Sequence, residues 1–466
     1  MRIINILFLF CLLGMFSSCS KFLDVNENPN QPTTAPINGL LGSTTYSTAT
    51  NVFNVGNLVS NYTQYLASPN LSSPSDIYEE VDGSGTWSAL YDNMTDLKDL
   101  EKIAIEKGAP YYQGISKIMM AMHLSLIEDV WGSAPYIDAF SLANLNPKYD
   151  KAEDIYQTSI KLLDEGIALL QGSSSISINA ALDFIHGGNV AAWIKTAFAM
   201  KARLLNQLSK TSQYNAGNVL TALASAYTSN TQDAQVKVFS VRNPWAGVAV
   251  ANAGLILQGW LSKNFVDAMN GTTFGIADPR LPLITNLTKF GDYRGTRNGA
   301  GRVGNGTSNE ESVLTTTGWY SSTNSPLQIA TYAEMKFIEA EVTFPTDKNR
   351  SYNAYLDGIR AHMSKMGVST AAMDTYVNSS QVSVGAGAIS LKRIMEEKYK
   401  AMFLHPAAWT DARRFNYQYT GFQMPLNAVL STFIRRMAYP SVELTRNGDN
   451  VPAVTGLDQR MWWDQN

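Results

Sequence analysis

The chain has 466 residues, with 36 Lys and Arg against 39 Asp and Glu, which gives a formal net charge of −3. This balance gives no electrostatic reason to expect nucleic-acid binding, because neutralising phosphates needs a clustered basic excess. Hydrophobic residues make up 45% of the chain and charged residues 16%, so it can bury a large core and is not disordered.

The first 18 residues have the features of a secretory signal peptide. Arg2 supplies a positive charge, and an apolar run follows over residues 4–15. This run is shorter than the roughly 20 residues that a membrane-spanning helix needs. Phe16-Ser17-Ser18-Cys19 then resembles a bacterial lipobox, in which the signal is cut before the cysteine and the thiol is lipidated. We predict a signal peptide over 1–18 and lipid attachment at Cys19; the alternative is an ordinary signal peptide with a chance cysteine.

Cysteine usage agrees with lipidation. The chain has two cysteines, and Cys11 falls within the segment that would be removed. A mature chain that begins at Cys19 has no internal disulfide, no thiolate metal site and no cysteine nucleophile. Acyl chains on Cys19 would hold the protein on a membrane by burying their methylenes. No later stretch of the sequence is apolar enough to span a bilayer.

The rest of the chain divides by composition and periodicity. Residues 19–75 are poor in charge and rich in Asn, Pro, Thr and Ser, which predicts a tether followed by irregular wrapping structure. From about Trp87 the apolar residues take helical spacing. Helices are predicted near 97–107, 115–126, 151–170, 190–208, 216–228, 255–269, 328–343, 350–366 and 391–403.

Two long polar stretches separate these helices, at about 229–253 and 271–325. Loops of that length in a compact protein are usually functional or disordered. No exact repeat of about 34 residues occurs, but paired helices with long insertions would suit a degenerate tetratricopeptide array.

Patterns that would indicate catalysis or cofactors are weak or missing. The four histidines form no H-E-x-x-H, and no G-x-S-x-G occurs. Gly299-Ala-Gly301-Arg-Val-Gly304 matches G-x-G-x-x-G but lacks the preceding strand and following helix of a dinucleotide site. Adjacent carboxylates such as Glu310-Glu311 do not predict the two facing carboxyls of a glycosidase, although distant residues could still supply them. We predict no catalytic residue, no cofactor and no metal.

Several segments, taken in order behind the lipobox, form a set. They are Cys19-Ser-Lys-Phe-Leu23-Asp24, Trp87-Ser-Ala-Leu90-Tyr91, Ala197-Phe-Ala-Met-Lys201-Ala202-Arg203-Leu204, the helix Tyr332 to Glu341 with its paired Ala-Glu, and Trp409-Thr-Asp411-Ala-Arg413-Arg414. Together they resemble the SusD/RagB family, starch-utilisation-type lipoproteins of Bacteroidetes outer membranes. Lys98 and Phe403-Leu404-His405-Pro406-Ala407 depart from the family's usual residues and indicate a divergent subfamily.

The resemblance implies a mainly α fold, a tetratricopeptide-like helix-pair superhelix with a loop-rich second half, in one domain over 19–466. It implies a surface nutrient-binding lipoprotein that captures oligo- or polysaccharide and delivers it to a TonB-dependent β-barrel transporter of the outer membrane (SusC-like), without catalysis. The alternatives are a lipid-anchored binding protein for a non-glycan nutrient such as a peptide, a cell-surface glycoside hydrolase, and a structural lipoprotein that holds other proteins.

Glycan capture needs exposed aromatic faces for the sugar rings and polar side chains for the hydroxyls. The candidates in the polar segments are Trp319, Tyr320, Tyr293, Arg294, Tyr78 and Trp87. A loop anchor is the alternative for Trp319, and packing at a helix start is the alternative for Trp87. Charges on the apolar helices are instead assigned to ion pairs of the scaffold: Arg203, Glu334, Glu341, Asp411 and Arg413.

Overall fold

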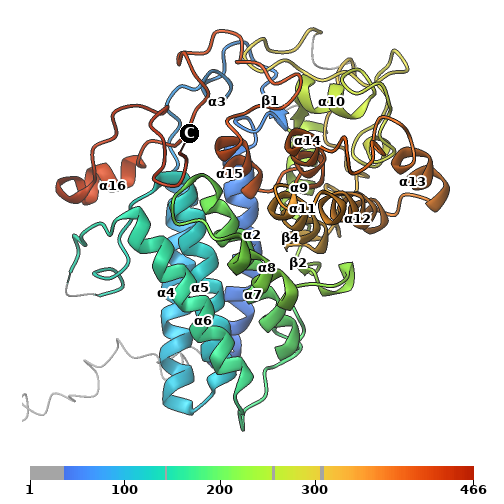
Figure 1. Cartoon of the computed structure of the whole chain (residues 1–466). Coiled ribbons are helices and arrows are strands. Elements are labelled where there is room, and N and C mark those ends of the chain that lie inside the picture. The colour runs from blue at the N-terminus through green and yellow to red at the C-terminus, as the bar shows by residue number, and fades with distance from the viewer. Residues whose placement is uncertain (1–35, 142–143, 254–257, 305–308, 466) are drawn as a thin grey trace, which may run out of the picture.

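The computed structural model describes residues 36–141, 144–253, 258–304 and 309–465 (Figure 1). The predicted signal peptide, Cys19 and the first part of the predicted tether lie outside these residues. The described chain is mainly helical, as predicted, and its strands are short.

The first half of the chain forms a row of helices in which neighbours in sequence pack against each other. They are α2 (Ile37–Val59), α4 (Ser84–Lys107), α5 (Pro110–Trp131), α6 (Ala152–Gln171), α7 (Val190–Gln207) and α8 (Ala216–Ser225). From α4 onward each helix packs on the next, and they lie side by side in Figure 1. The central helix α5 is buried along most of its length because α2, α4 and α6 all pack on it. These pairs are the predicted tetratricopeptide-like arrangement.

The prediction of irregular wrapping structure over 19–75 is partly wrong, because residues 37–59 form the 23-residue helix α2. Small polar residues misled the prediction. The hydroxyl of Thr44 donates to the carbonyl of Leu40 at 2.6 Å, and that of Thr48 to the carbonyl of Thr44 at 2.7 Å. These bonds satisfy the hydroxyls within the helix, so threonines pack in the core beside α4 and α5.

The rest of the described chain holds further helices, most of them short, and two small antiparallel sheets. The helices are α3 (Pro74–Ile77, from the first half), α9 (Pro244–Ala253), α10 (Lys263–Met269), α11 (Tyr332–Thr343), α12 (Lys348–Met366), α13 (Thr370–Val377), α14 (Leu391–Ala401), α15 (Ala407–Arg414) and α16 (Ser441–Arg446). Strand β1 (Leu66–Ala67) pairs with β3 (Trp260–Leu261), and β2 (Ala234–Val236) pairs with β4 (Leu327–Ala330).

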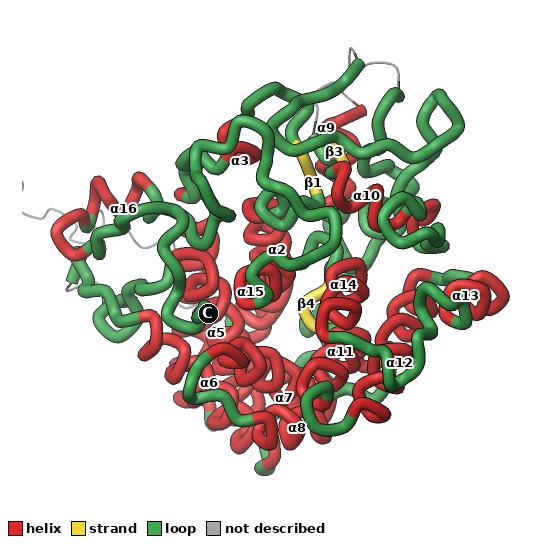
Figure 2. Tube along the Cα trace, turned by 45° about the horizontal axis from the view of Figure 1, so that its top comes forward, coloured by secondary structure: helices red, strands yellow, loops and turns green. Residues whose placement is uncertain are grey.

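The two polar stretches have different structures. Residues 229–253 contain β2 and α9, so the prediction of a long loop there is wrong; buried Val236 and Trp245 hold this segment to the core. The described part of 271–325 is irregular, as predicted, apart from the short 3-10 turn η4 (Leu281–Leu283). Figure 2 shows the loops gathered at one end of the molecule, around β1, β3 and α10.

The charges assigned to the scaffold join helices across the core. Arg203 on α7 and Glu334 on α11 form a bidentate pair at 2.5 and 2.6 Å. Arg414 on α15 binds Glu341 on α11 and also Asp411 at 2.7 Å. Arg413 differs from the prediction, because among the described residues it donates to backbone carbonyls and lies over the Trp409 ring at 3.9 Å, and it forms no ion pair with a carboxylate there.

Candidate functional site

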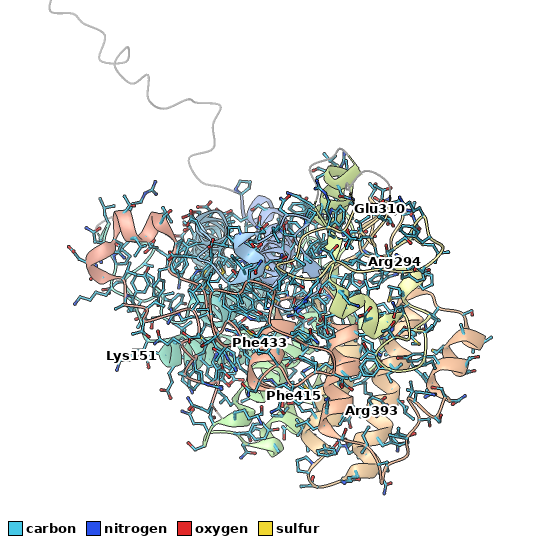
Figure 3. The ribbon with its side chains drawn as sticks, turned by 90° about the horizontal axis from the view of Figure 1, so that it is seen from above. Lys151, Arg294, Glu310, Arg393, Phe415 and Phe433 are labelled. Atoms are coloured by element: carbon cyan, nitrogen blue, oxygen red, sulfur yellow. The ribbon has the colours of Figure 1, made fainter. Side chains whose placement is uncertain are left out.

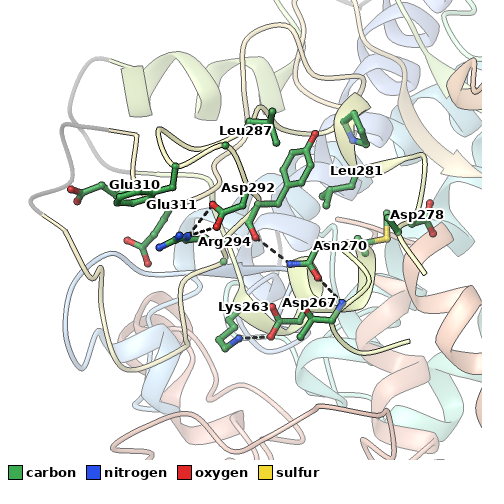
Figure 4. Close-up of a pocket in the computed structure, with 18 of the residues that line it drawn as sticks. Lys263, Asp267, Asn270, Asp278, Leu281, Leu287, Asp292, Arg294, Glu310 and Glu311 are labelled. Atoms are coloured by element: carbon green, nitrogen blue, oxygen red, sulfur yellow. Dashed lines mark hydrogen bonds and ion pairs between the residues drawn. The ribbon is translucent and has the colours of Figure 1, made fainter. Parts of the chain in front are cut away.

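A cavity of about 860 Å³ opens among the loops of the second half (Figure 4). Its walls come from α10, from residues 277–282, from the loop 287–295 and from the segments at 303–304 and 310–311. A volume of this size lies within the range of ligand-binding pockets in proteins. In Figure 3, which views the molecule from above, Arg294 and Glu310 lie on the side of the molecule that carries the cavity. Lys151, at the start of α6, lies on the opposite side.

Helix α10 supplies the polar wall of the cavity. Lys263 and Asp267, four positions apart, form an ion pair along its surface. At the end of the helix, Asn270 donates from its side chain to the carbonyl of Tyr293 at 3.1 Å and accepts from the backbone of Thr272 at 2.9 Å. Asn270 therefore ties the helix to the loop that carries Tyr293 and Arg294.

A tight turn in that loop presents an aromatic ring to solvent. The backbone N–H of Thr288 donates to the carbonyl of Asp292 at 2.7 Å, and the Thr288 hydroxyl donates to the Asp292 carboxylate at 2.6 Å. Phe290, between them, is 54% exposed, and Leu287 beside the turn is 49% exposed. Their position on the cavity wall leaves two apolar side chains on which a ligand can pack.

Arg294 lies over this turn. Its Nε donates to both carboxylate oxygens of Asp292, at 2.7 and 2.9 Å, and its guanidinium is 4.2 Å from the centroid of the Phe290 ring. The hydrogen bond from Thr288, followed by that from Arg294, lowers the pKa of Asp292, so its carboxylate is ionised at neutral pH. No described residue accepts from the terminal nitrogens of Arg294, which leaves these donors available to a ligand.

The remaining carboxylates of the lining have partners. Glu310 pairs with Lys289 at 2.5 Å. Glu311 is buried and accepts from the hydroxyl of Thr296 at 2.9 Å and the backbone of Val303 at 3.1 Å; burial raises its pKa. Asp278, a fully buried residue of the lining, is held by Arg280 at 2.5 Å. The cavity therefore has a fixed polar lining rather than mobile charges.

The glycine-rich match beside the cavity has a packing role. Gly299 has φ +80°, and a Cβ there would lie 1.9 Å from the carbonyl oxygen of Leu426. Gly301 has φ +69°, and a Cβ would lie 2.6 Å from the backbone nitrogen of Leu71. The glycines thus allow three distant segments to meet, and the next residues, Val303 and Gly304, form part of the cavity wall.

The structure brings two of the predicted ligand residues into this cavity, Tyr293 and Arg294. Trp319 is half-buried and lies outside the lining; its backbone N–H donates to the carbonyl of Leu283, behind the wall formed by η4. Whether Trp319 contacts a ligand stays a prediction, and this position also fits the alternative of a loop anchor.

The other three candidates are corrected to core residues, because each side chain is at most 5% exposed. The Tyr320 hydroxyl is hydrogen-bonded to His362 at 2.9 Å. Trp87 packs edge-on against Trp131, as in the helix-start alternative. Tyr78 lies in the core at φ +66°, a left-handed conformation that ends α3. None of them offers a ring face to solvent.

Sequence reasoning missed Phe290, Leu287 and the polar face of α10. Phe290 stands only two residues before Asp292, inside the polar stretch, so an isolated apolar residue among Thr, Lys and Gly was the available signal. Lys263 and Asp267 had the i, i+4 spacing of a helix surface pair but nothing that marked them as part of a site.

Among the residues that the structure describes, no group of three or more His, Cys, Asp or Glu side chains is placed to hold a metal ion. Within the same part of the chain, no helix combines the length and the apolar character that crossing a membrane requires.

Comparisons with known proteins place the whole fold. Residues 29–440 match the SusD-like family model described as "Starch-binding associating with outer membrane". The fold is similar to a SusD homolog of Bacteroides uniformis, at 20% identity, with a TM-score of 0.77 over 92% of this chain and 99% of that one. A SusD homolog of Bacteroides fragilis is similar at 20% identity, with a TM-score of 0.76 over 93% and 100% of the two chains.

A structure named as a chitin-binding protein is similar at 20% identity, with a TM-score of 0.73 over 92% of this chain and 99% of that one. No curated protein matches the chain. At these identities the solved structures show the fold, whereas the family model extends over most of the sequence.

Proposed function

The chain belongs to the SusD-like family, and from this membership and the geometry of the cavity we propose that it is a glycan-binding lipoprotein that delivers its ligand to an outer-membrane transporter. The family description joins starch binding with association with the outer membrane. The observation that carries the proposal is the exposed ring of Phe290, which lines an 860 Å³ cavity together with Tyr293 and Arg294.

These residues suit the chemistry of a sugar. Arg294 covers one face of the Phe290 ring; the exposed part of that ring and the ring of Tyr293 can pack against the C–H face of a pyranose ring with little side-chain entropy to lose. The terminal nitrogens of Arg294 and the ammonium of Lys263 can donate to hydroxyl groups, while Asp267 and Asp292 can accept from them. Because the ion pairs already hold these groups in place, little ordering is needed when a ligand binds.

The ligand we propose is an oligo- or polysaccharide, and starch and chitin fragments are the first probes, from the family description and from the chitin-binding neighbour. Isothermal titration of the full chain in mild detergent with maltooligosaccharides and chitooligosaccharides tests this. Phe290→Ala and Tyr293→Ala should weaken binding, and Leu444→Ala, a 53% exposed residue on α16, is the control that should not. If neither oligosaccharide series binds, glycan capture from these two classes is ruled out.

The membrane part of the proposal rests on Cys19 and on the family. Lipidation of Cys19 would anchor the protein, and a TonB-dependent β-barrel (SusC-like) would take up the captured ligand. A mild-detergent pull-down of the tagged lipoprotein from its native outer membrane tests the partner. A large β-barrel recovered in equal amounts supports delivery to a transporter, and recovery of the lipoprotein alone contradicts it.

The second candidate is a cell-surface glycoside hydrolase, and the observation that favours it is the set of carboxylates that line the cavity. A glycosidase needs one carboxyl that holds a proton and a second that is ionised across the sugar. Asp292 is ionised, and burial raises the pKa of Glu311. Turnover of an oligosaccharide that is lost in Glu311→Gln would support the hydrolase, but the family consists of binding proteins, and we favour binding.

A peptide ligand is the remaining alternative, and a peptide mixture that outcompetes the sugars would support it.

A further inference from the structure

A smaller hollow of about 240 Å³ adjoins the cavity. The two share Lys263 and Asp267, so the ion pair of α10 stands between them. The smaller hollow is lined by side chains from segments far apart in the sequence, among them Gln64, Thr273, Arg297 and Gln423. A volume of 240 Å³ is below the roughly 300 Å³ at which ligand pockets begin, so it suits one end of a longer ligand.

The inner wall of this hollow is held rigidly. The side-chain amide of Gln64 donates to the carbonyl of Gln423 at 2.6 Å. The hydroxyl of Ser262 donates to the side-chain oxygen of Asn298 at 2.7 Å, and the amide of Asn298 donates to the carbonyl of Leu66 at 2.9 Å. The wall is therefore built before any ligand arrives, because each of these buried polar groups has a fixed partner.

The outer wall differs, because two of its polar side chains make no interaction with the described residues. The Arg297 guanidinium and the Gln423 side-chain amide are exposed, and neither has a hydrogen-bond or ion-pair partner among the described residues. Gly421, at φ +85°, keeps the space open: a Cβ there would lie 3.3 Å from the side-chain oxygen of Asn264 and 3.7 Å from the hydroxyl of Thr273. Donors and acceptors thus surround a space that no side chain of the described residues fills.

Charge indicates the class of ligand. Both cations that line the larger cavity are engaged, Lys263 by Asp267 and Arg294 by Asp292. Three further carboxylates line it, namely Asp278, Glu310 and Glu311. In the larger cavity a sulfated or uronic-acid glycan would bring its negative charges beside these carboxylates, which disfavours binding there, whereas the unpaired Arg297 lies in the smaller hollow. A neutral glycan has no such penalty.

We propose that the two hollows are subsites for one neutral oligosaccharide that crosses the Lys263–Asp267 pair. The middle of the chain packs on Phe290 and Tyr293, and its end enters the 240 Å³ hollow, where Thr273, Arg297 and Gln423 bind the hydroxyls. This inference rests on the proposed glycan-binding function and adds to it a minimum chain length, a direction across α10 and a neutral ligand.

The test is affinity as a function of chain length. Full chain in mild detergent is titrated with maltooligosaccharides and chitooligosaccharides of two to seven units. For the series that binds, affinity should rise with length, and Arg297→Ala/Gln423→Ala should weaken the longest member about tenfold while leaving the disaccharide unchanged. Both side chains are exposed and have no hydrogen-bond or ion-pair partner in the described part of the chain, so the variant should fold normally. Arg446→Ala/Gln157→Ala, on α16 and α6, is the matched control.

Each result decides the matter. If the wild-type protein binds and the variant has the same affinity at every chain length, the second subsite is overturned but the proposed function stands. A variant that loses affinity equally for the disaccharide and the longest member also overturns it. If no member of either series binds the wild type, the inference fails together with glycan binding. An oligogalacturonate that binds more tightly than the neutral series overturns the assignment of a neutral ligand.

Discussion

The carboxylate of Asp76 accepts a hydrogen bond from the backbone N–H of Gly299 at 3.0 Å, although 223 positions separate the two residues. The same carboxylate accepts from the backbone of Ser68 at 2.9 Å and from the side chains of Asn61 and Asn298 at 2.6 and 2.8 Å. Asp76 is fully buried, and burial raises its pKa against the opposing effect of these hydrogen bonds. One side chain thus holds the N-terminal segment to the loop that continues into the cavity wall.

Removal of this carboxylate should destabilise the protein and loosen the cavity. Asp76→Ala leaves four donors without their acceptor, two of them buried and two part-buried, for which we expect a loss of about 3–5 kcal/mol in the free energy of unfolding. Asp76→Asn keeps one acceptor and should lose less. Urea denaturation followed by tryptophan fluorescence measures both. A loss below about 1 kcal/mol for Asp76→Ala would contradict the role assigned to this residue.

The Arg203–Glu334 pair makes a second prediction, on the scaffold. Burial alone would raise the pKa of Glu334, but Arg203 overrides this effect and lowers it below the ordinary 4.5. The pair therefore stabilises the fold fully above pH 4.5, and this contribution is lost as the pH falls further. Glu334→Gln at neutral pH should cost about 3 kcal/mol because it leaves the part-buried guanidinium of Arg203 without its charge partner.

A double-mutant cycle separates this pair from general packing. Arg203→Met/Glu334→Leu should be less destabilised than the sum of the single variants, because it removes both charges together. Additive losses would show that the two residues act independently. Circular dichroism melts at pH 7 and pH 4 provide the measurement, and the single variants should lose less at pH 4 than at pH 7.

The third prediction concerns the aromatic wall. Phe290→Ala and Tyr293→Ala should each weaken the binding of the best oligosaccharide about tenfold, or ~1.4 kcal/mol. The melting temperature of Phe290→Ala should change little, because the Phe290 side chain is 54% exposed. Trp319→Ala should change affinity less than Tyr293→Ala, because Trp319 lies outside the lining. A larger loss of affinity in Trp319→Ala at unchanged stability would restore it as a ligand residue.

The helical half of the fold could be predicted because its information is periodic. Val190, Trp193 and Ala197 repeat at helical spacing, and the structure has α7 there with its apolar face buried. Helix α2 could not be predicted, because Thr, Gly and Ala are interspersed among the Leu and Val residues of its buried face, and small and polar residues of this kind are common in loops. The threonine hydroxyls can be buried in α2 because they donate to carbonyls one turn earlier, and these hydrogen bonds are visible only in three dimensions.

The site was harder to predict for a different reason. Tyr293 and Tyr320 both stand in the same polar stretch of sequence, yet the first lines the cavity and the second is buried against His362. Composition indicates that a loop carries aromatic rings but not which way each ring points. Orientation is set by partners such as Asn270 and Thr288, which hold the loop from other parts of the chain or from within a turn.

The last prediction is a pH dependence set by Glu128. This buried carboxyl accepts from the indole N–H groups of Trp462 and Trp463 at 2.7 and 2.9 Å, and so holds the C-terminal segment to α5. Burial, followed by the neighbouring charge of Asp129, raises its pKa from 4.5 to about 8. The folded protein therefore keeps a proton that the unfolded chain releases, so the stabilisation is complete below pH 4.5 and declines as the pH rises toward 8.

Glu128→Gln isolates this effect, since an amide keeps the acceptor oxygen and carries no charge at any pH. The variant should match the wild type near pH 5 and exceed it in melting temperature at pH 8, where wild-type Glu128 is partly ionised. Glu106→Gln, an exposed residue of α4, should follow the wild type at both pH values. If Glu128→Gln shows the same decline from pH 5 to pH 8 as the wild type, another group carries the dependence, and the tryptophan contact is only a packing contact.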